Sequence, residues 1–203
     1  MTNYLSKIFA LKNKMPLYSN HLNTILSLNG GGSPSAPVPY QLIENGDFAS
    51  TDKWSGTNCA VSVTSNNVGV ATVSTVNSAI RITHEAFEIT KDHKYYYQIF
   101  VYPPKQIKFR ISRGTAAIID RTISGGDWSR IEGIYSSTTT TSDLTLRYYF
   151  DRDSVLTKTQ KVYFSWAQLI DLTATFGAGN EPTTVEEVNA LYPNSYYEYN
   201  PAE

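Results

Sequence analysis

Aromatic, amide and arginine side chains recur at alternate positions in three segments of the chain. The spacing groups Tyr96 with Gln98 in residues 94–102 and Arg147 with Tyr149 in residues 143–150, and Arg110 stands in the same kind of pattern in residues 106–112. Alternate residues of a β-strand point to one face of its sheet. Aromatic rings can stack on the C–H face of a pyranose while guanidinium and amide groups hydrogen-bond its hydroxyls. We therefore expect a polar and aromatic surface able to bind a glycan, made of Tyr96, Gln98, Arg110, Arg147 and Tyr149.

The same pattern has a second interpretation that needs no ligand. Tyrosines on an exposed sheet face stabilise cross-strand pairs, and arginines between them make cation–π contacts. Such a face would be solvated or would contact another subunit, and the sequence leaves both interpretations open.

The residues that could catalyse a reaction do not form a recognisable set. A glycosidase needs two carboxylates across a cleft, whereas the acids here fall mainly where strand ends and turns are expected. The histidines, His21, His84 and His93, are scattered, and no serine or cysteine stands in a nucleophile motif. We therefore expect a protein that is not an enzyme.

The elements that must position the candidate surface are β-strands. Residues 40–172 alternate apolar and polar side chains, with turn signals about every 8–12 residues, the pattern of a sandwich or barrel. The expected strands are residues 60–64, 68–75, 79–84, 94–102, 106–112, 117–122, 129–137, 143–150 and 162–169. The pattern predicts an all-β fold, a jelly-roll sandwich of two antiparallel sheets.

Composition excludes several classes of protein. The chain has 203 residues, 17 Lys plus Arg against 18 Asp plus Glu, and a net charge of −1, a balance that argues against a nucleic-acid partner. The lone cysteine, Cys59, cannot form an intramolecular disulfide. No apolar run approaches the roughly 18 residues of a membrane span. Lysines interrupt the apolar N-terminus, which is therefore not expected to be a secretory signal.

The ends of the chain differ from its middle. Residues 1–28 form an apolar arm, and residues 29–39 form a linker rich in glycine and proline. The arm is expected to anchor the protein on a partner or on copies of itself, through Tyr4, Leu5, Ile8, Phe9 and Leu11; alternatively, it packs back on its own domain. Residues 173–203 are expected to form a turn, a short helix over 183–191 capped by Thr183 or Thr184, and an aromatic tail that packs on the sandwich.

Three strings carry a resemblance to a known family. Leu42-Ile-Glu-Asn-Gly-Asp-Phe48 followed by Trp54 resembles the opening motif of the jelly-roll carbohydrate-binding modules of families 4, 9 and 22. Residues 125–135 and 162–170 resemble two further strands of these modules, although Ser165-Trp166-Ala167 replaces the usual Asp-Asn-Val. The resemblance implies a structural calcium ion as the one candidate cofactor, with Glu44, Asp47 and Asp171 as the acids to consider.

A second resemblance concerns residues 168–187. This segment, which includes Phe176-Gly-Ala-Gly-Asn-Glu-Pro182, is similar to one that recurs in phage tail, fibre and baseplate proteins. It implies a virion structural protein made in the bacterial cytoplasm and displayed on the particle. The arm would contact other virion proteins, the chain would form a homo-oligomer, expected to be a trimer, and the jelly roll would bind host-surface glycans. The alternatives are a stand-alone carbohydrate-binding module and an architectural virion protein that binds no glycan.

Overall fold

The computed structural model describes residues 36–76, 79–114, 116–151, 155–194 and 196–200. The proposed arm, with Tyr4, Leu5, Ile8, Phe9 and Leu11, lies outside these residues. The elements follow one another along the described chain as β1 (Tyr40–Gln41), β2 (Trp54–Thr57), β3 (Cys59–Val63), β4 (Gly69–Val73), β5 (Ile80–Ile89), β6 (Lys94–Tyr102), β7 (Ile107–Arg113), β8 (Ala116–Ile123), β9 (Ser129–Ser136), β10 (Thr141–Asp151), β11 (Lys161–Asp171), α2 (Leu172–Phe176) and α3 (Val185–Leu191).

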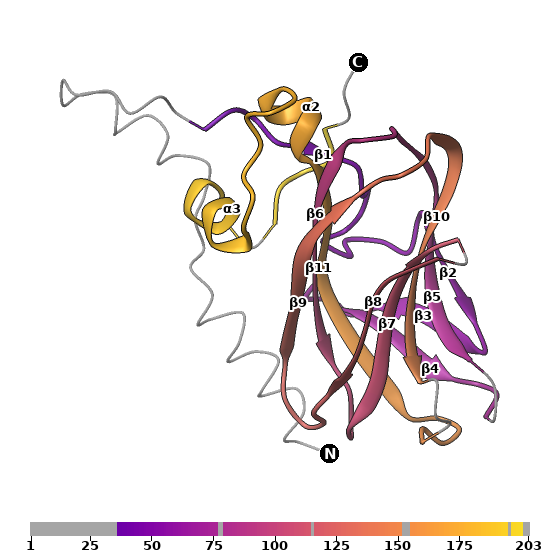
Figure 1. Ribbon diagram of the computed structural model, residues 1–203. Helices are drawn as coiled ribbons and strands as arrows, with labels where there is room; N and C mark the ends of the chain where they lie inside the picture. The colour runs from indigo at the N-terminus through magenta and orange to yellow at the C-terminus, as the bar shows by residue number, and fades with distance from the viewer. Residues whose placement is uncertain (1–35, 77–78, 115, 152–154, 195, 201–203) are drawn as a thin grey trace.

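The strands form two antiparallel sheets that face each other (Figure 1). Sheet A has the order β3-β4-β11-β6-β9, and β1 pairs with the end of β11; sheet B has the order β2-β5-β10-β7-β8. The expected all-β jelly-roll sandwich is therefore confirmed. Each of the nine expected strands is present, with ends shifted by up to five residues, whereas the short strands β1 and β2 were not expected.

The main core lies between the sheets and follows the alternation of the sequence. Ile99 and Val101 of β6 belong to this core together with Phe109 and Ile111 of β7, and these side chains are fully buried. Burying a large apolar side chain contributes about 1.5–3 kcal/mol each. The strands alternate because one face of each packs into this core.

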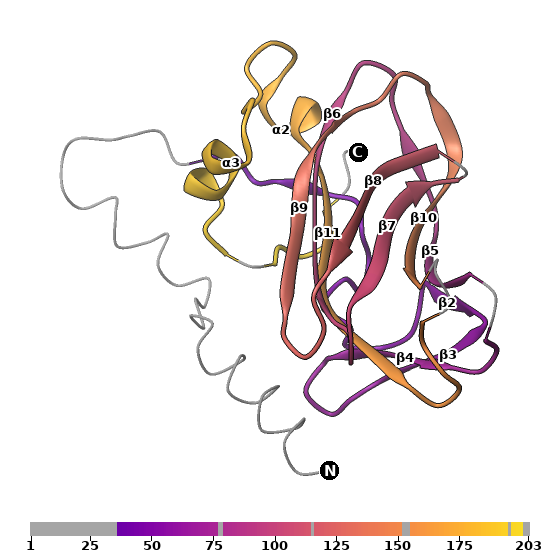
Figure 2. The same ribbon diagram turned by 60° about the horizontal axis from the view of Figure 1, so that its bottom comes forward.

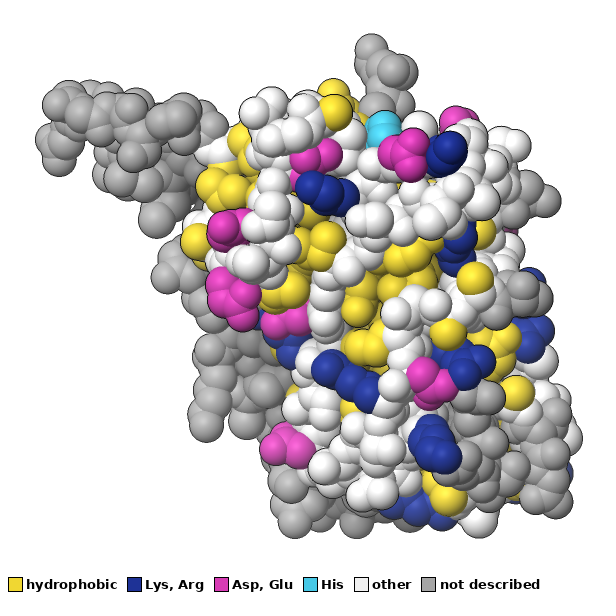
Figure 3. Space-filling view, viewed as in Figure 1, with side chains coloured by type: hydrophobic (Ala, Val, Ile, Leu, Met, Phe, Trp, Pro, Cys, Tyr) yellow, Lys and Arg dark blue, Asp and Glu magenta, His cyan; other side chains and the backbone are white. Residues whose placement is uncertain are grey.

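The opening motif closes one edge of the sandwich. The rings of Phe48 and Trp54 lie 4.8 Å apart, both are buried, and the indole Nε1 of Trp54 donates a 3.0 Å hydrogen bond to the carbonyl of Asn45. The edge between β9 and β8 is more open. Apolar side chains gather there on the face seen in Figure 3, and the partly buried core residues on these two strands are Ile118, Ile119 and Tyr135.

The C-terminal helix forms where the sequence predicts it. Thr184 is the N-cap of α3, and its hydroxyl accepts a 3.2 Å hydrogen bond from the amide of Glu187, whose carboxylate accepts one from the amide of Thr184. Such a capping box satisfies two amides that the helix leaves unpaired. Residues 172–176 form a further helix, α2, which was not expected. Both helices lie beside sheet A (Figure 2).

Candidate functional site

The outer face of sheet B carries the candidate site. Tyr149 of β10 stands between Arg81 of β5 and Arg110 of β7 in register, and Arg110 stands opposite Asp120 of β8. We call this group the sheet B surface and define it by six residues from four neighbouring strands: Arg81, Lys108, Arg110, Asp120, Arg147 and Tyr149. The five residues on β5, β7 and β10 point outward because their neighbours in the strand belong to the core, and Asp120 pairs with Arg110 on the same face.

The arginines hold defined positions around the tyrosine. The guanidinium carbon of Arg81 lies 5.4 Å from the centre of the Tyr149 ring, a cation–π geometry. Arg110 Nε lies 3.0 Å from Asp120 Oδ2, and Arg147 Nη1 donates a 3.1 Å hydrogen bond to the carbonyl of Gly114. Guanidinium groups are planar and present several donors in a fixed fork, so these contacts leave a partly exposed ring with ordered donors beside it.

The charge of the sheet B surface is unlike that of the whole chain. Four of its six residues are cationic and Asp120 is its one carboxylate, whereas the whole chain carries a net charge of −1. A clustered positive charge raises the local concentration of anions. The arrangement suits a ligand that combines an apolar face with an acidic group.

Two of the five residues expected on this surface do not belong to it. Tyr96 and Gln98 lie on β6 of sheet A, and their side chains are 2% and 1% exposed. Alternation predicted correctly that the two residues share a face of their strand, but it could not tell which sheet the strand joins or what covers that face. Val188 of α3 and Tyr192 cover Tyr96, so the expectation of one continuous surface is wrong.

The Tyr96 hydroxyl is the buried centre of a partly exposed polar network. It lies 2.7 Å from Glu132 Oε2 and accepts a 3.0 Å hydrogen bond from Arg130 Nη2. Arg130 also donates to Asn189 Oδ1 at 2.7 Å, which ties β9 to α3. Tyr96 therefore holds the C-terminal helix on sheet A, a structural role in place of the expected contact with a ligand.

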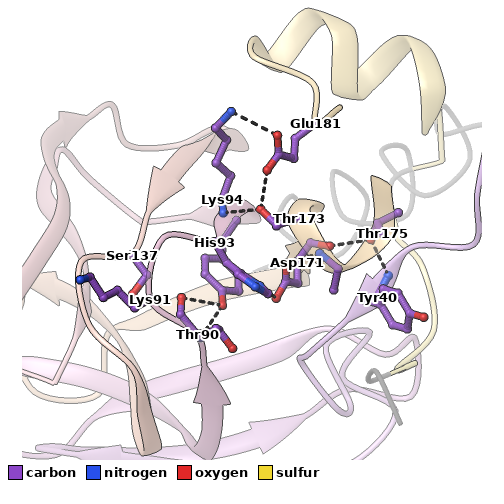
Figure 4. Close-up of polar contacts among 12 residues, drawn as sticks. Tyr40, Thr90, Lys91, His93, Lys94, Ser137, Asp171, Thr173, Thr175 and Glu181 are labelled. Atoms are coloured by element: carbon purple, nitrogen blue, oxygen red, sulfur yellow. Dashed lines mark hydrogen bonds and ion pairs between the residues drawn. The ribbon is translucent and has the colours of Figure 1, made fainter. Parts of the chain in front are cut away.

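Asp171, one of the acids considered for calcium, is used within the fold (Figure 4). Its Oδ1 accepts a 2.8 Å hydrogen bond from the amide of Ala174 at the start of α2, and its Oδ2 lies 2.8 Å from Nδ1 of His93. Next to it, the hydroxyl of Thr173 donates to Glu181 at 2.8 Å, and Lys94 Nζ lies 3.4 Å from the same carboxylate. The Thr173 hydrogen bond, backbone amides and Lys94 hold the pKa of Glu181 below its usual value.

The other two acids lie elsewhere. Glu44 Oε2 is 3.9 Å from Nζ of Lys53, and Asp47 Oδ1 accepts a 3.2 Å hydrogen bond from the amide of Ala49. Within the described residues, no group of three histidine, cysteine, aspartate or glutamate side chains is placed to hold a metal ion. The structure does not bring Glu44, Asp47 and Asp171 together as one ligand set.

A second aromatic group lies on the outer face of sheet A, and the sequence did not predict it as a group. The ring centre of Tyr102 lies 5.7 Å from that of Trp128 and 6.1 Å from that of Tyr163, and the rings of Phe100 and Trp166 are 5.6 Å apart. We call these five residues the sheet A aromatic surface. Trp128 is half-buried here.

The position of Trp166 shows why alternation missed this surface. The pairing of β11 with β6 shifts between Ser165 and Gln168, and Trp166 within this bulge has φ 50°. A bulge redirects a side chain and breaks the period of two. The replacement of Asp-Asn-Val by Ser165-Trp166-Ala167 was the available signal.

Comparisons with known proteins show a likeness of fold. An arabinose-bound α-L-arabinofuranosidase matches over 80% of this chain and 34% of its own, with a TM-score of 0.57 and 13% identity. The xylan-binding domain of a Paenibacillus barcinonensis protein matches over 65% of this chain and 98% of its own length, with a TM-score of 0.47 and 13% identity. A tailspike domain of bacteriophage CBA120 matches over 64% of this chain and 21% of its own length, with a TM-score of 0.47 and 12% identity.

These similarities are limited to the fold. The chain spans about a third of the length of the arabinofuranosidase, and the shared identity is low in every case. No protein family profile and no curated protein sequence matches the chain. Neither described helix is long and apolar enough to cross a membrane.

Proposed function

We propose that this protein is a non-catalytic glycan-binding domain and that the sheet B surface is its binding site. The observation that carries the proposal is the ring of Tyr149, partly exposed and flanked by Arg81 and Arg110 on the sheet opposite the helices. The jelly-roll sandwich is also the fold of the carbohydrate-binding modules that the sequence resembles, which supports this assignment.

The cations of the sheet B surface favour saccharides that carry carboxylate or other acidic groups. An arginine can bind a carboxylate through two parallel hydrogen bonds while the adjacent ring of Tyr149 contacts the apolar face of the sugar. Neutral glycans would gain the ring contact and lose the charge-assisted bonds. Weak binding at one site would be strengthened by several copies on one particle.

A glycan array with acidic and neutral oligosaccharides, followed by calorimetry on the best ligand, tests the proposal. Hydrogen bonds to charged groups contribute about 1.5–3 kcal/mol, so Arg147→Ala should weaken binding of an acidic ligand about tenfold or more. Tyr149→Ala should weaken binding of acidic and neutral ligands alike, and added salt should weaken only the acidic ones.

Matched controls are available elsewhere on the surface. Tyr199→Ala removes another exposed tyrosine and Lys161→Ala another exposed cation, and neither lies on the sheet B surface. Both variants should bind like the wild type. Binding that survives Tyr149→Ala and Arg147→Ala unchanged would reject the sheet B surface as the site.

We further propose that the protein is a phage virion component, a fibre or decoration protein that forms a homo-oligomer, expected to be a trimer. The resemblance of residues 168–187 to a segment of phage structural proteins supports this role. The apolar residues Tyr4, Leu5, Ile8, Phe9 and Leu11 would anchor the chain to other virion proteins or to its own copies. The stand-alone module and the purely architectural protein remain the competing proposals.

Light scattering on the full chain tests the assembly. The wild type should have the mass of a trimer, and the double substitution Leu5→Asp with Ile8→Asp should shift it toward the monomer because it places charge on the anchoring cluster. A wild-type monomer at all concentrations would favour the stand-alone module. A trimer that binds no glycan on the array would favour the architectural protein.

A further inference from the structure

The chain enters its described part on the outer side of sheet A. Ala36 packs against the cluster formed by Tyr96, Ile170, Leu172, Val188 and Tyr192. The carbonyl of Pro37 accepts a 2.8 Å hydrogen bond from the hydroxyl of Tyr192. Figure 2 shows this first described segment beside α3. The residues that precede Ala36 therefore start from the side of the molecule that also carries the sheet A aromatic surface.

Two buried polar groups on the outer face of sheet A, one beside the sheet A aromatic surface and one within it, have no hydrogen-bond partner among the described residues. Ser165 is 5% exposed, and its hydroxyl finds no hydrogen-bond partner in the described part of the chain; the same holds for the buried indole Nε1 of Trp128. Buried donors in folded proteins are normally bonded. These two groups, on neighbouring parts of one face, point to a segment that supplies acceptors there.

The composition of this face suits a protein segment. It combines tryptophan, tyrosine and phenylalanine with Arg130, whose guanidinium carbon lies 5.8 Å from the ring centre of Phe100. Aromatic residues and arginine are the types enriched where two protein surfaces meet. The neighbouring rings meet at angles of 58° to 90°, so they form an uneven surface rather than a flat platform for a sugar ring.

The length of chain before Ala36 is sufficient to reach this face. Eight residue steps separate residue 28 from residue 36, and an extended chain spans about 3.3–3.6 Å per step, so roughly 26–29 Å is available. The six steps of β6 from Tyr96 to Tyr102 cover roughly 20 Å at ~3.3 Å per residue. A segment that ends at residue 28 can therefore lie over the aromatic surface of its own domain.

We propose that residues 22–28 dock on the sheet A aromatic surface of the same chain. This segment contributes Leu22, Ile25, Leu26 and Leu28 to cover the rings, and its backbone carbonyls and polar side chains would accept from Ser165 and Trp128. The anchoring cluster near the N-terminus would then stay available for a partner, with the linker held close to the domain. This docking does not depend on glycan binding by sheet B.

Quenching of tryptophan fluorescence by acrylamide in the full chain tests the docking. Trp128 and Trp166 lie on the proposed contact, while Trp54 is in the core. The double substitution Ile25→Asp with Leu26→Asp should raise the quenching constant several-fold. Adding Trp128→Phe and Trp166→Phe should abolish that rise, because only the core tryptophan then remains.

The control is Leu5→Asp with Ile8→Asp, which alters the other apolar cluster of the arm and should leave quenching as in the wild type. Equal quenching in the wild type and the Ile25/Leu26 variant would overturn the proposal. Loss of shielding in the Leu5/Ile8 variant, together with a lower mass by light scattering, would overturn it in favour of an arm from a second copy. Shielding produced only by an added oligosaccharide would overturn it in favour of a glycan.

Discussion

Two buried tyrosines show how much the role of one residue type depends on its surroundings. Tyr148 lies in the main core between Trp54 and Phe109, and its hydroxyl has no hydrogen-bond partner within the described chain. Burial raises the pKa of Tyr148, so it stays neutral. The hydroxyl of Tyr96, by contrast, joins Glu132 and Arg130 beneath α3. A buried hydroxyl without a hydrogen-bond partner opposes folding because its desolvation is not compensated. A hydroxyl that is hydrogen-bonded in the fold makes a net favourable contribution to stability.

Tyr148→Phe and Tyr96→Phe should therefore change stability in opposite directions. The first variant removes an unsatisfied hydroxyl and should keep or raise the free energy of unfolding, by up to about 1 kcal/mol. The second leaves Glu132 and Arg130 without their shared partner and should lower it by about 1–3 kcal/mol. Urea denaturation measures the free energy of unfolding of both variants. A loss of stability in Tyr148→Phe as large as that in Tyr96→Phe would contradict the conclusion that only the Tyr96 hydroxyl stabilises the fold.

Glu181 should contribute to the loss of stability in acid. Its pKa is lowered in the fold, first by the Thr173 hydroxyl, from an ordinary value of about 4.3. The ionised Glu181 therefore contributes fully to the free energy of unfolding when the pH is above the ordinary pKa. This contribution is lost as the pH falls through the lower pKa of the folded state. Glu181→Gln should therefore flatten the fall in stability as the pH drops below the ordinary pKa of a glutamate. Glu88→Gln, at an exposed position of β5, should leave the curve unchanged; identical curves for wild type and Glu181→Gln would exclude this role.

At the scale of elements, the opening motif and the last strand fix each other. The carbonyl of Gly46 accepts a 2.8 Å hydrogen bond from the amide of Ala167, within the bulge of β11. A Cβ atom at position 46 would lie 2.0 Å from the carbonyl oxygen of Ala167. The loop can approach the bulge only because residue 46 has no side chain.

Gly46→Ala should lower the free energy of unfolding by about 1–3 kcal/mol or more, because the backbone must shift to admit the methyl group. Gly126→Ala is the matched control. Gly126 has φ 81°, and no atom lies within 4 Å of the place that a methyl group would take, so only the backbone strain of about 1–2 kcal/mol applies. Thermal unfolding of the two variants compares them, and a smaller effect at position 46 than at position 126 would refute the close-approach argument.

The sequence predicted those elements whose periodicity extends over several residues. Alternation located β6 at its observed bounds, and the capping pattern of Thr184 and Glu187 located α3. The strands β1 and β2 are too short to show a period, and α2 depends on a cap by Asp171 that only the end of β11 brings into place.

The candidate site was predictable in part for the same reason. Arg110, Arg147 and Tyr149 share the outer face of sheet B as expected, because pairing in register brings neighbouring strands together. Tyr96 and Gln98 were assigned to that face wrongly, since the alternation of one strand carries no information on which sheet it joins or on the helix that covers it.

At the scale of the whole molecule, the two outer sheet faces have different surroundings. The outer face of sheet A carries α3, the polar network of Tyr96 and the aromatic surface near the entry of the chain. The outer face of sheet B carries cations around Tyr149. If both proposals hold, this division would separate attachment of the domain on the side of sheet A from recognition of a ligand on the side of sheet B.

Hydrogen exchange measured by mass spectrometry, with and without the acidic oligosaccharide that binds best on the array, tests this division most directly. The proposal predicts slower exchange in peptides from β5, β7 and β10 when the ligand is bound, and no change in β6, β11 or α3. The protection should disappear in Tyr149→Ala and persist in Tyr199→Ala. Protection confined to β6, β11 and α3 would contradict the assignment of the sheet B surface as the glycan-binding site.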